Sequence, residues 1–100
     1  MGLFGPPDIE KLKARKNVKA LIRCLRYKKD ASVRADAAET LGELGDARGL
    51  KPLMAALSDG QYTVQKYAVR ALERIGDDRA VAALLPLLAE SDRNLRSQAV

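Results

Sequence analysis

The side chains in this sequence that could do chemistry are two pairs of carboxylates and one thiol. The pairs are Asp77–Asp78 and Glu39–Glu43, and the thiol belongs to Cys24. Neighbouring carboxylates can divide general acid and base work between them. Helix capping explains the first pair, however, and a solvated helix face explains the second. Neither pair therefore predicts a catalytic site.

The chain contains no histidine, which excludes imidazole bases, histidine metal ligands and histidine-based triads. One cysteine cannot build a zinc cluster or an internal disulfide. We expect Cys24 to pack beside an apolar stripe as a structural thiol, with a reactive thiol near Arg23 and Lys28 as the alternative. The sequence thus predicts a protein that is not an enzyme and needs no cofactor or metal.

A unit of 31 residues must position these side chains. The segment that begins at Val33 matches those that begin at Val64 and Leu95, each 31 residues further on. Within a unit the apolar residues recur at helical spacing, as at Val33, Ala37 and Leu41. A fixed period of this length indicates a stacked array of repeats. No segment alternates with a period of two, so we expect no strands.

Helix boundaries follow from the repeat and from its turn residues. Gly45 and Gly76 are placed to end helices, and Asp46 and Asp77 are placed to cap the next ones. The predicted helices span 8–16, 18–27, 32–44, 47–58, 63–75, 79–89 and 94–100. The fold class is therefore all-α, with a single domain over residues 1–100. Its predicted parts are a capping segment (1–17), repeat 1 (18–45), repeat 2 (46–76) and an incomplete repeat 3 (77–100).

Two short patterns recur along the chain. The pattern D-x-x-V-R-x-x-A-A-x-x-L is carried by Asp30, Val33, Arg34, Ala37, Ala38 and Leu41, and in part by Asp92, Leu95, Arg96 and Ala99. The pattern G-D-x-R-x-L/V is carried by Gly45, Asp46, Arg48 and Leu50, then by Gly76, Asp77, Arg79 and Val81. Over residues 18–100 the chain resembles HEAT repeats of the short type found in phycobilisome-lyase-like proteins.

This resemblance implies a right-handed α-solenoid of about two and a half repeats, used mostly for protein–protein binding. A few members of the family are chromophore lyases or metal-dependent hydroxylases, but the hydroxylase iron site needs histidine. The resemblance also implies a ladder of turn aspartates and arginines that links successive repeats. The pairs that fit are Asp30 with Arg34 and Asp92 with Arg96, whereas repeat 2 has Gln61 and Gln65.

Arrays of this kind present their second helices on the concave side, so helices 32–44 and 63–75 form the predicted partner face. Opposite the core, the first carries Ala35, Glu39, Gly42 and Glu43, and the second carries Lys66, Arg70, Glu73 and Arg74 with Tyr67 beside them. Two interpretations stay open. Glu39 could pair with Arg70, and Glu43 with Arg74, as ion pairs between repeats. Alternatively, the basic stripe and Tyr67 form one wall of a groove for an acidic segment of a partner.

Positive charge is concentrated at the start of the chain. Residues 1–29 hold nine Lys and Arg against two acidic residues, a formal charge of +7, whereas residues 30–100 carry −2. The candidate basic cluster is Lys11, Arg15, Lys19, Arg26, Lys28 and Lys29. A solvated cap over the first repeat explains it. Binding to a nucleic-acid backbone is the alternative, followed by an acidic protein or a membrane surface.

The leading hypothesis is therefore a non-enzymatic scaffold that binds a protein partner on the face of its second helices. The alternatives are nucleic-acid binding and a non-catalytic part of a lyase-like protein. No apolar run reaches the roughly 18 residues of a membrane span and no signal peptide is evident, so we expect a cytoplasmic protein. Because the last helix stops at Val100, we expect it to fray or to be completed by another chain through self-association.

Overall fold

The structure, a computed structural model, describes residues 7–76. Over this range the chain is helical and contains no strand. The elements are α1 (Ile9–Ala14), α2 (Val18–Cys24), α3 (Ala31–Leu44), the 3-10 helix η1 (Ala47–Gly49), α4 (Leu50–Ala56) and α5 (Tyr62–Ile75). The predicted helices 79–89 and 94–100, the pairs Asp77–Asp78 and Asp92–Arg96, and the expected fraying near Val100 lie outside the described residues.

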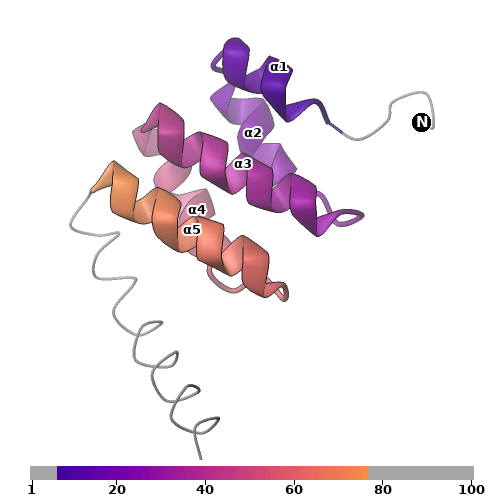
Figure 1. The fold of residues 1–100 in the computed structure, drawn as a ribbon. Coiled ribbons are helices and arrows are strands. Elements are labelled where there is room, and N and C mark those ends of the chain that lie inside the picture. The colour runs from indigo at the N-terminus through magenta and orange to yellow at the C-terminus, as the bar shows by residue number, and fades with distance from the viewer. Residues whose placement is uncertain (1–6, 77–100) are drawn as a thin grey trace, which may run out of the picture.

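The helices form two layers. The long helices α3 and α5 lie side by side, the short helices α2 and α4 lie behind them, and α1 stands at the end of the stack (Figure 1). The helices α3 and α5 each contain 14 residues, and they begin 31 residues apart. The predicted all-α solenoid built on this period is confirmed.

Side-chain caps and left-handed glycines set the helix ends. Helices α1, α2 and α3 and the 3-10 helix each begin at a side chain that accepts a backbone N–H, namely Asp8, Asn17, Asp30 and Asp46. Gly45 ends α3 with φ of 65° and Gly76 ends α5 with φ of 67°, a conformation that glycine adopts without steric cost. Both glycine ends and the cap at Asp46 were predicted from the sequence, whereas the cap at Asn17 was not.

The first helix of each pair is shorter than predicted. Predicted helix 18–27 ends at Cys24, where the amide of Arg26 bonds to the carbonyl of Arg23 (3.0 Å). Predicted helix 47–58 divides into η1 and α4, and the amide of Ser58 again bonds three residues back, to Ala55 (3.1 Å). These tighter i to i+3 bonds close the last turn of each helix and leave the following residues free to form the connection to the next helix.

The core lies between the two layers and is made of aliphatic side chains. Its largest fully buried members are Leu21, Leu41, Leu53, Val64 and Leu72. They come from α2, α3, α4 and α5, as the predicted apolar stripes require. Truncating one such leucine to alanine costs about 2–5 kcal/mol of stability, because the lost contacts leave a cavity.

Helix α3 is buried on two sides rather than one. Ala35 is 3% exposed and Gly42 is buried, so their predicted place on the open face is wrong. A β-carbon built on Gly42 would lie 2.6 Å from the Cα of Ala71 in α5. Small residues therefore let the backbones of α3 and α5 approach closely, and this contact joins one repeat to the next.

Candidate interaction surface

A stripe of cations runs along the open side of α5. Lys66, Arg70 and Arg74 recur every four residues and are all exposed. Tyr67 is half-buried beside them, with the Nζ of Lys66 6.0 Å and the Cζ of Arg70 5.7 Å from its ring centre. Both distances lie within the range at which a cation is attracted to a ring face. The tyrosine ring and these two cations therefore form one cluster on the surface of the helix.

This stripe borders a cleft between α3 and α5, lined by Glu39, Tyr67, Arg70, Ala71 and Arg74. The structure thus brings together most of the residues that the sequence singled out on the two second helices. Glu73, which was assigned to the same face, is also exposed but does not line this cleft. The surface that α3 and α5 form at and beside this cleft is called the front face below, and it comprises Glu39, Glu43, Lys66, Tyr67, Arg70 and Arg74.

The predicted ion pairs across this cleft are wrong. Among residues 7–76 neither Glu39 with Arg70 nor Glu43 with Arg74 forms a salt bridge. Glu43 instead pairs with Lys13, 2.5 Å away on α1. The hydrogen bond from Lys13 lowers the pKa of Glu43, and the bond to Glu43 raises the pKa of Lys13. Helix α1 packs against α3 and so supplies a nearer cation than α5 does.

A second cleft, between α1 and α3, is acidic. Its charged lining residues are Asp8, Glu10, Lys13, Asp36, Glu39 and Glu43. Glu39 lines both this acidic cleft and the cleft along α5, so the two clefts adjoin at this residue of α3. Sequence reasoning missed the acidic cleft because it treated α1 only as part of a basic segment. The signal was present in Asp8 at the start of the helix and in Glu10, which lies three residues before Lys13 and so on the same side of α1.

Arg34 links the two repeats by a different contact from the one expected. Its Nε donates to Oδ2 of Asp59 at 2.8 Å, its Nη2 donates to Oδ1 at 3.2 Å, and its Nη1 donates to the carbonyl of Tyr27 at 2.8 Å. The predicted partner, Asp30, instead accepts from Ser32. The bonds from Arg34 lower the pKa of Asp59. This forked contact, called the Arg34–Asp59 clamp below, serves the structure, since its polar atoms are all occupied by neighbours.

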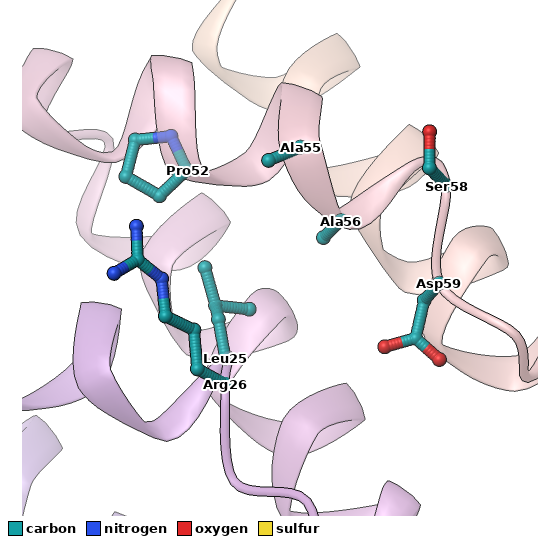
Figure 2. Close-up of a pocket in the computed structure, with 7 residues that line it drawn as sticks. All are labelled: Leu25, Arg26, Pro52, Ala55, Ala56, Ser58 and Asp59. Carbon is teal, nitrogen blue, oxygen red and sulfur yellow. The ribbon is translucent and has the colours of Figure 1, made fainter.

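The six residues of the basic cluster are all exposed, but they come from separate elements. They lie on α1, on α2, in the turn between these helices and in the segment that leads to α3. Arg26 extends from the end of α2 toward Pro52, along a groove whose other lining residues include Leu25, Ala55 and Ala56 (Figure 2). The carboxylate of Asp59 at the far end of this groove is already bound by Arg34. The groove therefore offers apolar contact rather than reactive groups.

The remaining candidate for chemistry is the thiol of Cys24, which is 5% exposed. Burial raises its pKa, so the reactive thiolate is disfavoured and the expectation of a packed structural thiol is confirmed. Residues 7–76 hold no cluster of three or more His, Cys, Asp or Glu that could bind a metal ion. Over the same range, each helix is too short or too polar to cross a membrane.

Comparisons with known proteins agree with the repeat architecture. A family model described as HEAT repeats matches residues 11–100. Phycocyanobilin lyase subunit alpha of Picosynechococcus sp. is 37% identical over 78 residues. The match covers 72% of this chain but 29% of that protein, so the chain spans less than a third of the length of this curated relative.

Proposed function

This chain belongs to the HEAT-repeat family, and from that premise we propose that it is a non-catalytic module that binds a protein partner on its front face. Repeats of this kind generally mediate protein interactions, and their function is decided by the site that each member displays. The proposal therefore depends on the side chains that α3 and α5 expose.

The observation that carries the proposal is that the three cations on α5 are exposed and form no salt bridge with the other described residues. Lys66, Arg70 and Arg74 are exposed, and none forms a salt bridge within residues 7–76. Arginine and tyrosine are the residues most enriched where a partner binds strongly. Tyr67 is half-buried beside the cations, so its ring is held in place before a partner arrives. The partner with complementary chemistry is an acidic segment that crosses α5.

Binding to an acidic probe tests this proposal. A fluorescein-labelled hexaglutamate peptide is titrated with the full chain, and its fluorescence anisotropy is followed at low and at high salt. The double variant Arg70→Glu/Arg74→Glu should reduce the affinity by at least roughly tenfold, because attraction becomes repulsion at two contacts. The matched control is Arg23→Glu/Lys51→Glu, which makes the same change of net charge at exposed sites on α2 and α4. Equal losses in both variants would refute a specific front face.

A second proposal follows from the named relative. Because the chain is 37% identical to part of a phycocyanobilin lyase subunit alpha, we propose that it acts as a non-catalytic part of a lyase-like assembly. On this proposal the chain binds a protein of the assembly and does not bind the pigment. Adding the chain to phycocyanobilin should therefore leave the visible absorption spectrum unchanged. A spectral shift that Arg70→Glu/Arg74→Glu abolishes would make the front face a pigment site instead.

A further inference from the structure

Equivalent positions in the two described repeats carry opposite charges. Glu39 and Arg70 are 31 residues apart, as are Glu43 and Arg74, and 31 residues is the length of the repeat. These residues therefore occupy the same height along α3 and α5. The front face is thus acidic along α3 and basic along α5, with the acidic side continued by the cleft between α1 and α3.

Such a face is complementary to itself. Consider a two-fold axis that runs parallel to the α3–α5 cleft. Rotation by 180° about this axis places the front face of a second copy against that of the first, with the acidic side of each copy opposite the basic side of the other. Helix α3 of each copy then lies opposite α5 of the other. The rotation does not move a residue along the direction of the axis, so equivalent positions of α3 and α5 face each other. We propose that the front face binds a second copy of this chain in this manner, with Glu39 of one copy opposite Arg70 of the other and Glu43 opposite Arg74. A two-fold contact forms each of these pairs twice, as in other symmetric homodimers.

The charges on this face are available for such a contact. Glu39 and Arg70 are exposed and form no salt bridge within residues 7–76. Glu43 is held by Lys13, yet its side chain remains 27% exposed. Glu39 and Arg70 can therefore pair across two chains without breaking an existing salt bridge, whereas Glu43 would share its carboxylate between Lys13 and Arg74 of the other copy. Because the same face is proposed to bind an acidic partner, the second copy and that partner would compete for α5.

The contact is polar and exposed, so it should be weak and sensitive to salt. The screening length is about 30 Å at 0.01 M salt and about 3 Å at 1 M salt. Sedimentation velocity of the purified full chain should therefore show a concentration-dependent dimer at roughly 20 mM salt and a monomer at roughly 1 M salt. A monomer at low salt at every concentration up to the millimolar range would overturn the proposal.

A charge exchange tests the register of the pairing. Glu39→Arg and Arg70→Glu are made in separate chains, each of which places like charges opposite each other in its own dimer. Each variant alone should dimerise at least roughly tenfold more weakly than the original chain. In an equimolar mixture the new arginine of one variant faces the new glutamate of the other. The original Glu39 and Arg70 that the two variants retain also face each other, so dimerisation should return.

The matched control is Arg23→Glu, which changes the charge of an exposed residue on α2 and should leave dimerisation intact. Circular dichroism establishes that each variant is folded. Undiminished dimerisation of either variant, or a mixture no stronger than its components, would refute the proposed geometry. The hexaglutamate titration needs no dimer, so the binding function and the self-association can fail independently.

Discussion

Substituting alanine for Gly42 tests the close approach of α3 and α5. Alanine favours the helical conformation but would overpack the contact with α5, and the balance of these two effects decides whether the protein is stabilised or destabilised. In the interior of an exposed helix, glycine to alanine stabilises by about 1 kcal/mol. In this structure the added β-carbon would lie 2.6 Å from Cα and 2.7 Å from Cβ of Ala71. Carbon atoms pack comfortably at about 3.5–4.0 Å, so the two helices would have to separate by about 1 Å.

Neither atom of Ala71 can rotate away, since one is backbone and the other is fixed to it. Overpacking of this kind costs about 1–3 kcal/mol, and the rigid neighbour places Gly42→Ala at the upper end of that range. After the helical gain is subtracted, we expect a net loss of about 1–2 kcal/mol. For a domain of this size, each kcal/mol lowers the melting temperature by about 4–8 °C.

Thermal unfolding followed by circular dichroism measures this effect. Gly60→Ala is the control, because a β-carbon there meets nothing within 4 Å and the residue lies in a turn. Its melting temperature should match or slightly exceed that of the original chain. If Gly42→Ala is as stable as the original chain or more stable, the helices do not pack as closely as described and the account of repeat stacking is wrong.

Three further predictions concern the clamp, the thiol and the basic cluster. Arg34→Met should lower the free energy of unfolding by about 1–3 kcal/mol near neutral pH, because it removes charged hydrogen bonds to Asp59. Since Arg34 holds the pKa of Asp59 below its usual range, that contribution is present above the unfolded-state pKa of about 3.9 and is lost as the pH falls through the folded-state value. Urea unfolding at several pH values should show the difference shrinking in acid, and a constant difference would contradict the role of Asp59. Cys24 should react with a thiol reagent far more slowly in the folded chain than in denaturant, and equal rates would show that it is not buried. Mobility-shift assays with DNA and RNA at low salt should show no complex, whereas a complex lost in Lys28→Glu/Lys29→Glu would assign nucleic-acid binding to the basic cluster.

The sequence predicted the features of this fold that depend on local pattern. The 31-residue period, the apolar stripes and the glycines at helix ends are properties of neighbouring residues, so they can be read without coordinates. The faces of α3 were harder to predict. Ala35 and Gly42 carry little hydrophobic signal although both are buried, and Gly42 is buried because its small size permits a close backbone contact with α5. Small residues on the same side of a helix were the available clue.

Long side chains were placed less well than the backbone. Arg34 and Glu43 were correctly identified as residues that contact neighbouring elements, but each has another partner than the one predicted. A long side chain can reach several elements, and the choice among them depends on tertiary packing. Glu43 pairs with Lys13 because α1 packs on α3, and no periodicity in the sequence encodes that arrangement.

Mapping the acidic probe by nuclear magnetic resonance tests the central claim most directly. Amide shifts of the full, isotope-labelled chain are followed while hexaglutamate is added. The account predicts that the largest changes fall on α5 between Lys66 and Arg74 and on Glu39 across the cleft. Changes concentrated on α2 and α4, or spread evenly over every exposed cation, would contradict a binding site on the front face.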